Sequence, residues 1–349
     1  MENIKVGLIG FGKAAQVFHA PLIQVSPELH LKKVVERHHD KSKSRYPWVE
    51  VVRSVEELLE DETITLVVIA TPNDTHFPLA KQAILANKHV VVDKPMAITS
   101  KQARDLIDLA KRQNVILSVF HNRRWDGDFL TVRQLLAEKK LGRLVEFESH
   151  FDRFRNLRKE GWREKEGVGT GILYDLGSHL IDQALILFGL PQMVMADLRI
   201  QRDTAQVIDN FELILFYPNL KVSLKAGMLV REPQTRFILH GMNGSYVKYG
   251  LDPQEDALKK GLVPGRADWG EELIDKWGKI NTDFQGTHIE ESLQTQPGAY
   301  ENFYNNIANV ILHREKLHVK AEEAMNTMRI IELALQSHEK KCIIPYTFE

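Results

Sequence analysis

Short apolar segments alternate with amphipathic segments over the first third of the chain. Five segments rich in β-branched residues have the length of strands: Ile4–Ile9, Leu31–Val35, Leu66–Ala70, Val90–Val92 and Val115–Val119. Three helical segments lie between them: Ser54–Glu60, Phe77–Ala86 and Ser100–Gln113. Continuous apolar strands that alternate with helices are typical of a parallel sheet covered on both faces. The pattern therefore predicts an α/β fold for this part of the chain.

A different pattern follows in the remainder of the chain. Six further segments are strand-like: Leu144–Phe151, Met193–Ile200, Phe211–Phe216, Lys221–Leu229, Thr235–His240 and Gly244–Lys248. No helix intervenes between the last four, which predicts hairpins and an antiparallel sheet. Helical segments at about 174–188 and 321–337 flank these strands. The stretch Pro253–Pro297 is charged and weakly periodic, and we interpret it as surface loops with short helices, a candidate lid.

Length and charge restrict the class of protein. A chain of 349 residues suggests two domains. Lys plus Arg number 46 and Asp plus Glu number 47, so the net charge is −1 and gives no general attraction to nucleic acid or acidic membranes. The apolar runs are too short to cross a membrane. Cys342 is the single cysteine, which excludes an internal disulfide and favours a cytoplasmic location.

The first strand-to-helix junction carries a glycine motif. Gly10, Phe11, Gly12, Lys13, Ala14 and Ala15 fit the pattern G-x-G-x-x-A. In a dinucleotide site the first glycine allows the tight turn, the second lets the pyrophosphate approach the backbone, and the small third residue lets helix and strand pack closely. The helix N-terminus then offers N–H groups to the phosphates. The alternative is a plain turn, but the position at the first βα junction favours NAD or NADP binding.

The end of the second strand bears on the choice between these cofactors. Glu36 and Arg37 follow Leu31–Val35, and Glu36 lies 36 − 12 = 24 positions after Gly12. A carboxylate there accepts hydrogen bonds from the ribose hydroxyls and repels a 2′-phosphate. Arg37 can stack on adenine or bind that phosphate. The balance favours NAD slightly, with use of both; the alternative is a solvated Glu–Arg pair at a strand end.

Two more motifs follow strand ends, and with the glycine motif they resemble one family. The motifs are Ala70-Thr71-Pro72-Asn73-Asp74-Thr75-His76 and Asp93-Lys94-Pro95. The resemblance is to the Gfo/Idh/MocA (glucose–fructose oxidoreductase/inositol dehydrogenase) family, in which the second motif usually reads Glu-Lys-Pro, so Asp93 departs from it by one methylene. The runs 121–126, 161–167 and 174–183 resemble the branch that contains NADP-dependent scyllo-inositol dehydrogenase.

This resemblance implies a fold in two parts. Residues 1–120 would form a Rossmann domain with a doubly wound parallel sheet. Residues 121–349 would form a C-terminal α/β domain with an open, mostly antiparallel sheet, for substrate binding and dimerisation. The last helix, at about 321–337, would pack back on the Rossmann domain. A homodimer or a higher homo-oligomer is expected, since the strands from 211 to 248 have few helices to cover both faces.

The resemblance also implies the catalytic residues Lys94, Asp175 and His179. Asp175 and His179 are four apart on a predicted helix, so both project from one face. Taken alone, they favour a buried Asp–His pair in the core. A metal pair lacks a suitably spaced third ligand, and we predict no metal site. Lys94 changes the balance, because it ends a predicted parallel strand, at the edge where such sheets bind ligands.

Other residues are weaker candidates for contact with the cofactor. The candidates are Thr71, Pro72, Asn73, His76, Asp93, Lys94, Asn122, Arg124, Trp162 and Arg163. Three alternatives stay open: His76 as a helix-start or packing histidine, Asn122 and Arg124 in salt bridges between the domains, and Trp162 and Arg163 on an exposed loop.

A basic cluster, Arg153, Arg155, Arg158 and Lys159, is flanked by Asp152 and Glu160. The flanking acids and the neutral net charge argue against nucleic acid, and a mobile loop closing over a polar substrate is expected.

These features together predict an enzyme. The expected activity is hydride transfer between NAD(P) and a CH–OH group of a cyclic polyol or sugar, with His179 as general base and Lys94 stabilising charge on the reacting oxygen. In the same class, a reductase of the related ketone is the alternative. In another class, the alternative is a sugar- or nucleotide-sensing regulator that binds NAD(P) without turnover. Such regulators tend to lose the lysine or the histidine, and this chain has both.

Overall fold

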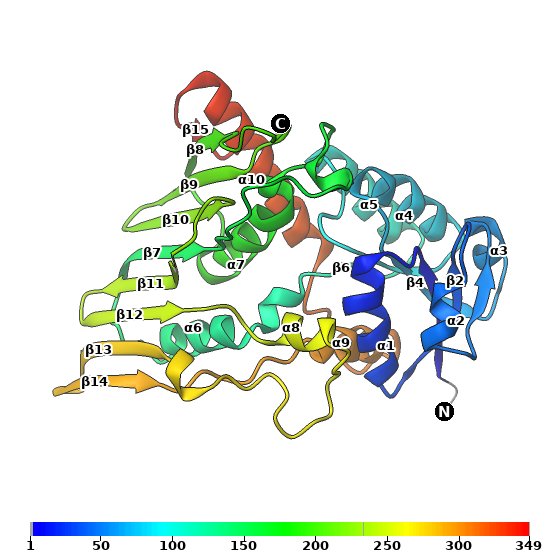
Figure 1. Ribbon diagram of the computed structural model, residues 1–349, viewed down its shortest axis with the longest axis horizontal. Coiled ribbons are helices and arrows are strands. Elements are labelled where there is room, and N and C mark those ends of the chain that lie inside the picture. The colour runs from blue at the N-terminus through cyan, green and yellow to red at the C-terminus, as the bar shows by residue number, and fades with distance from the viewer. Residues whose placement is uncertain (1–2, 233, 349) are drawn as a thin grey trace. The chain divides into compact units, whose positions relative to one another are not determined.

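The computed structural model describes residues 3–232 and 234–348 (Figure 1). The chain divides into two compact units, each of which is described by itself. Unit 1 comprises the stretch up to Trp125 together with Pro253–Trp269 and Ala299–Met325. Unit 2 comprises Asp126–Asp252, Gly270–Gly298 and the stretch from Asn326 onward. Unit 1 therefore includes two later segments, Pro253–Trp269 and Ala299–Met325, which the predicted division at residue 120 placed in the second domain.

Unit 1 is built on a parallel sheet of six strands. Their order is β3-β2-β1-β4-β5-β6, which is the doubly wound order and confirms the predicted fold. The strands are β1 (Ile4–Ile9), β2 (Leu29–Val35), β3 (Glu50–Val52), β4 (Ile64–Ile69), β5 (His89–Val92) and β6 (Leu117–Val119). The edge strand β3 was not predicted, because only two of its three residues are apolar.

Helices cover this sheet on both faces, as alternate residues of β4 demonstrate. Leu66 and Val68 belong to one apolar cluster, whereas Val67 and Ile69 belong to another. The helices are α1 (Ala20–Val25), α2 (Lys41–Arg45), α3 (Val55–Leu59), α4 (His76–Leu85), α5 (Ser100–Arg112), α8 (Gln254–Lys259) and α9 (Glu301–Ile311). Helix α5 begins after Thr99, whose hydroxyl accepts a hydrogen bond from the backbone N–H of Gln102.

Unit 2 contains a sheet of nine strands in the order β14-β13-β12-β11-β7-β10-β9-β8-β15. The strands are β7 (Leu144–His150), β8 (Met193–Arg199), β9 (Asn210–Tyr217), β10 (Leu220–Gly227), β11 (Thr235–Gly241), β12 (Gly244–Tyr249), β13 (Gly278–Phe284), β14 (Thr287–Leu293) and β15 (Ile344–Pro345). Neighbours are antiparallel except β7 and β10, which confirms the mostly antiparallel sheet.

Two expectations about this sheet were wrong. β10 and β11 do not form a hairpin, because β7 lies between them and pairs with both. The stretch Pro253–Pro297 is not only loops and short helices, because β13 and β14 form a hairpin within it. Its two turn residues, Gln285 and Gly286, have φ of +52° and +80°, as a tight hairpin turn requires. The few apolar residues of these strands gave no clear period.

Helices lie against one face of this sheet (Figure 1). They are α6 (Gly127–Ala137), α7 (Ser178–Phe188) and the later part of α10 (Ala321–Lys340). Phe129, Leu180 and Ile331, one from each helix, share an apolar cluster with the strand residues Phe147 and Phe237. Within residues 3–232 and 234–348, no helix has the length and apolar character that a membrane span needs.

Candidate active site

The glycine loop connects β1 to a helix at the carboxyl edge of the unit 1 sheet. Gly10 has φ +87°, and its N–H donates to the carbonyl of Val35 at 3.2 Å. A Cβ at Gly10 would lie 2.9 Å from Cγ2 of Thr71, so this position requires glycine. Gly12 is exposed, and a Cβ there would meet nothing within 4 Å. The open space over Gly12 is what a pyrophosphate needs to approach the backbone.

The helix that follows begins with an irregular turn. Ala15–His19 form a π-helical turn that continues into α1. The N–H of Gln16 donates to the Gly12 carbonyl at 3.0 Å, and its side-chain amide donates to the Phe11 carbonyl at 2.7 Å. Ala15 is fully buried, as the motif requires, and Lys13 is exposed. The glycine loop and this helix start fit a dinucleotide phosphate cradle.

The Glu36 side chain at the end of β2 is turned toward α2. Glu36 is buried, and one carboxylate oxygen accepts hydrogen bonds from the N–H and hydroxyl of Ser42 at 2.8 and 2.6 Å. The other oxygen accepts from the N–H of Lys41 at 3.0 Å. Three hydrogen bonds therefore hold this carboxylate on the first residues of α2. The alternative of a solvated pair is wrong for Glu36, whereas Arg37 is exposed.

The segment after β4 is stabilised internally. The hydroxyls of Thr71 and Thr75 lie 2.6 Å apart, and Asn73 is buried, whereas Pro72 is exposed. His76 is completely buried, and its Nδ1 and Nε2 lie 2.7 and 3.0 Å from the carbonyl oxygens of Pro95 and Thr71. Both ring nitrogens thus lie against backbone carbonyls, and the one that carries the proton donates a hydrogen bond. His76 therefore fits the packing alternative and ties two loops together rather than facing a cofactor.

The motif after β5 holds a buried charge. Asp93 is buried, and its Oδ1 accepts a hydrogen bond from the N–H of Lys94 at 2.8 Å. Burial opposes ionisation of this carboxyl, but the neighbouring His19 and the positive charge of Lys94 outweigh it and lower the pKa of Asp93 to about 2. Lys94 is half-buried at the carboxyl end of β5. The edge of the unit 1 sheet therefore carries a fixed carboxylate next to the candidate lysine.

The segment after β6 is mainly structural. Asn122 and Arg124 lie in a short 3₁₀ turn, Asn122–Trp125, and both are buried. The Arg124 guanidinium donates to the carboxylate of Glu323 at 2.7 Å and to the His318 carbonyl at 3.1 Å. All of these residues belong to unit 1. This ion pair gives Arg124 a role within its own unit.

In unit 2 the candidate catalytic pair lies on one continuous helix. This helix opens with a π-helical turn, Leu173–Gly177, and continues as α7. Asp175 lies in the π turn with its side chain 28% exposed, and His179 lies in the first turn of α7 and is buried. π turns inside helices are rare, and those that occur frequently lie at functional sites. Farther along, the amide oxygen of the buried Gln183 accepts a hydrogen bond from Arg236 at 2.8 Å.

Trp162 and Arg163 approach this pair from the preceding loop. Nε of Arg163 lies 3.6 Å from Oδ1 of Asp175, and the Arg163 guanidinium lies over the Trp162 ring, 4.5 Å from its centroid. Both residues are half-buried, although the loop around them is mostly exposed. The structure thus joins Trp162, Arg163 and Asp175 on one side of unit 2.

The candidate residues fall into two groups. The glycine loop, the end of β2, the segment after β4 and Lys94 lie in unit 1, at the ends of neighbouring parallel strands. Trp162, Arg163, Asp175 and His179 lie in unit 2. Among the described residues, no three His, Cys, Asp or Glu side chains gather as metal ligands.

Three charged residues beside the second group gave no signal in the sequence. They are Glu164, Arg202 and Asp209, which meet only in the folded chain.

Comparison with known proteins identifies the class of protein. Residues 4–121 match the family model for the oxidoreductase family, NAD-binding Rossmann fold, and residues 133–347 match the model for its C-terminal alpha/beta domain. The chain belongs to the Gfo/Idh/MocA oxidoreductase family and is an NAD(P)-dependent dehydrogenase of that family.

Particular relatives cover nearly the whole chain. The uncharacterized oxidoreductase YdgJ of Escherichia coli is 48% identical, over 98% of this chain and 99% of the relative. The scyllo-inositol 2-dehydrogenase (NADP(+)) IolW of Bacillus subtilis is 40% identical, over 98% of this chain and 95% of the relative. The solved structure of yvaA from Bacillus subtilis has a TM-score of 0.96 at 40% identity, with 99% of each chain covered.

Proposed function

We propose that this enzyme oxidises a CH–OH group of a cyclic polyol or sugar, with an inositol-like ring as the substrate class. The observation that carries the proposal is one helix that opens with an uncommon π turn, places the partly exposed Asp175 beside Arg163, and carries the buried His179 in its next turn. Charged and hydrogen-bonding groups of this kind suit a substrate with many hydroxyls. The full-length similarity to a scyllo-inositol 2-dehydrogenase supports the same class.

In this proposal each catalytic residue has a separate task. Bound NAD(P) supplies the acceptor for the hydride that leaves the substrate carbon. His179 accepts the proton of the substrate hydroxyl, because an imidazole can take up and release protons near neutral pH. Lys94 donates a hydrogen bond to the same oxygen and stabilises its developing negative charge. Asp175 holds a neighbouring substrate hydroxyl and fixes the orientation of His179.

We infer in addition that the enzyme prefers NADP to NAD. The sequence favoured NAD because a carboxylate at position 36 would repel a 2′-phosphate, but the Glu36 carboxylate is bound by the first residues of α2. Arg37, Lys41 and Arg45 are exposed around it. Arg45 donates to the Gln16 carbonyl at 2.9 Å, which places α2 beside the helix of the glycine loop. A basic surface at this position fits a 2′-phosphate.

We propose further that the enzyme is a cytoplasmic homo-oligomer. The face of the unit 2 sheet that lies opposite its helices carries the half-buried side chains Ile214, Phe216 and Ile238 and the exposed Met195 and Tyr249. Apolar side chains on an open sheet face favour association with a second copy. Light scattering at micromolar concentration gives the mass of a dimer or larger assembly if this is correct, and the mass of a monomer in a fully active sample contradicts it.

One screen tests the proposed activity. The purified protein is incubated with inositol isomers, simple sugars and the corresponding ketones, each with NAD(H) and NADP(H), and the absorbance of the reduced nicotinamide is followed. Turnover of at least one polyol, faster with NADP, is expected. Tight cofactor binding without turnover of any compound favours the alternative of a sensing regulator and contradicts the proposal.

A further inference from the structure

We infer that Arg202 is a positioning residue that fixes residues 152–171, here called the basic loop, so that Arg163 stays against Asp175. The inference rests on the proposed function for its kinetic consequence, but its structural part stands on unit 2 alone. The basic loop connects β7 to the π turn that carries Asp175. It contains the basic cluster noted in the sequence, and it begins at the carboxyl end of β7.

Hydrogen bonds from the described loop backbone to the sheet lie at its start. The N–H groups of Arg153 and Arg155 donate to the carbonyls of Gly227 and Met228 at 2.9 and 2.7 Å. Near the other end, the N–H of Gly171 donates to the Arg163 carbonyl at 3.0 Å. Between these points the described backbone bonds of the loop are internal, as between Glu164 and Gly161. Side chains must therefore hold the middle of the loop.

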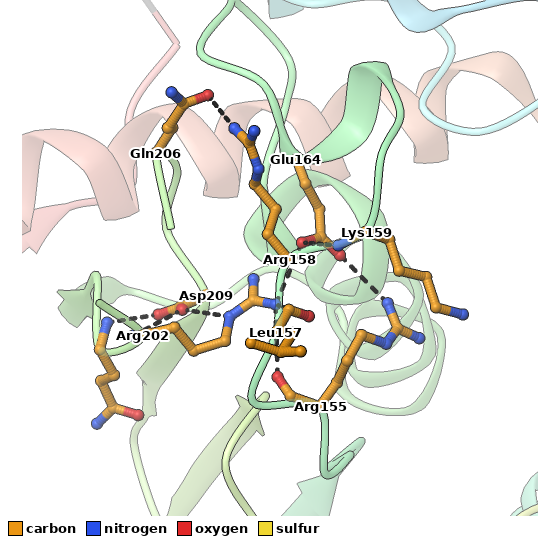
Figure 2. Close-up of polar contacts among 9 residues, drawn as sticks. Arg155, Leu157, Arg158, Lys159, Glu164, Arg202, Gln206 and Asp209 are labelled. Atoms are coloured by element: carbon orange, nitrogen blue, oxygen red, sulfur yellow. Dashed lines mark hydrogen bonds and ion pairs between the residues drawn. The ribbon is translucent and has the colours of Figure 1, made fainter. Parts of the chain in front are cut away.

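A buried charged cluster supplies that support (Figure 2). The Arg202 side chain is 1% exposed, and its Nε lies 2.8 Å from Oδ2 of the equally buried Asp209. Its Nη1 lies 3.1 Å from the carboxylate of Glu164 and donates to the carbonyls of Arg155 and Leu157 at 3.4 Å. The Arg202 guanidinium, in the connection between β8 and β9, thus links Asp209 to three points of the basic loop.

Glu164 passes this constraint on to the residues beside it. Its carboxylate is mostly buried, pairs with Arg155 at 3.2 Å and accepts the N–H of Lys159 at 3.1 Å (Figure 2). Arg163 is the adjacent residue, and its Nε lies 3.6 Å from Asp175. Because the buried cluster holds the Glu164 side chain, the preceding residue, Arg163, keeps its place beside the π turn. The cluster therefore determines where the positive charge beside Asp175 lies.

The space within the cluster is small. The cavity that Arg155, Arg163, Glu164, Asp175, Arg202 and Asp209 line has a volume of about 60 Å³. Sites for small molecules usually occupy roughly 300–1,000 Å³, so the space around the buried Arg202 and Asp209 does not enclose a polyol. Buried ion pairs contribute little net stability compared with apolar side chains of similar size. A geometric role explains why so many charges are buried at this place.

The first experiment measures the loop itself, with Arg202→Met and Glu164→Gln as variants. Arg199→Met is the matched control, because Arg199 ends β8, is 61% exposed and pairs with the exposed Asp197. Limited trypsin digestion of each folded protein is followed by mass spectrometry, and melting curves confirm folding. Cleavage after Arg163 and Lys165 should be about tenfold faster in both variants and unchanged in the control. Unchanged cleavage in both variants overturns the inference.

The second experiment tests action through Arg163. On the polyol substrate, Arg202→Met should lower kcat/KM about 10–100-fold while the cofactor Kd stays within twofold. In an Arg163→Ala background, Arg202→Met should add less than a twofold effect. Effects that multiply fully in the double variant overturn the positioning role and leave a merely structural one. If the wild-type enzyme oxidises no polyol, the proposed function fails, and cleavage after Arg163 alone decides whether the cluster directs that residue.

Discussion

Two loops carry candidate chemistry in this protein, and they are fixed in different ways. The glycine loop of unit 1 is held by its own backbone, through the φ of Gly10 and the hydrogen bonds of Gln16 to residues 11 and 12. The basic loop of unit 2 is held by side chains, chiefly Arg202 and Glu164, which lie 38 positions apart in the sequence.

The difference explains what each loop reveals in the sequence. A turn fixed by glycine conformation and small residues leaves a short local motif. A loop fixed by buried ion pairs leaves only scattered charges, which look like a solvated surface until the chain has folded. A side chain added at a glycine should therefore disturb the first loop. The second loop should loosen when one charged side chain that is distant in the sequence is removed.

The largest effect is expected where the chemistry itself is removed. His179→Ala and Lys94→Ala should each lower kcat about 10²–10⁴-fold, the usual range for a positioned acid–base group. Because the glycine loop is independent of both side chains, the Kd of the cofactor, measured by fluorescence titration, should stay nearly unchanged. Turnover close to that of the wild type in both variants would return Asp175 and His179 to the role of a buried core pair.

The glycine loop offers a matched pair of substitutions. Gly12→Ala should leave the melting temperature unchanged, since its Cβ meets nothing within 4 Å, but should weaken cofactor binding by about 1–3 kcal/mol, or roughly 5–150-fold. Gly10→Ala should instead destabilise the fold by about 1–3 kcal/mol, because of its φ of +87° and the contact with Thr71. Calorimetric melting and cofactor titration of both variants separate the two effects. A destabilised Gly12→Ala protein with normal affinity contradicts the assigned roles.

Cofactor choice extends the comparison to the end of β2. Arg37→Ala should lower kcat/KM for NADP about 10–100-fold, as expected for loss of a charged hydrogen bond to a phosphate, and should leave NAD within twofold. Lys43→Ala, on the exposed side of α2, is the control. The ratio of kcat/KM for the two cofactors is the measurement. A ratio that Arg37→Ala leaves unchanged would remove the basis for an NADP preference.

The last effect concerns a buried carboxylate at the unit 1 edge, that of Asp93. The pKa of Asp93 is lowered to about 2, so its ionised form stabilises the fold above pH ~4 by about 2–3 kcal/mol, and this contribution is lost as the pH falls from about 4 to 2. The difference in unfolding free energy between wild type and Asp93→Asn should be largest at pH 5–7 and should shrink toward pH 3. Urea titrations at several pH values measure it, with the exposed Asp74→Asn as control. A difference in unfolding free energy that does not change with pH refutes the lowered pKa of Asp93.

The sequence determined the features that depend on local spacing. The alternation of apolar strands and helices predicted the parallel sheet, the glycine motif predicted its first turn, and the apolar segment around Asp175 and His179 predicted the helix that carries both. The motifs after β4 and β5 identified the family. Each of these signals lies within a few residues of chain, where backbone conformation and side-chain period act directly.

Only the tertiary structure decided the features that depend on distant partners. β7 inserts between β10 and β11, although β10 and β11 are consecutive in the chain and β7 comes well before both. The sequence suggests Glu36 as a ribose ligand, but in the folded chain Ser42 and Lys41 donate hydrogen bonds to its carboxylate. The sequence also suggests His76 as a cofactor contact, but in the folded chain its ring lies against the carbonyls of Pro95 and Thr71. The ion pairs of Arg202 with Glu164 and Asp209 form only in the folded chain, and no local pattern in the sequence indicates them. A charged or polar side chain has several possible partners, and burial selects one of them because an unpaired buried charge costs too much free energy.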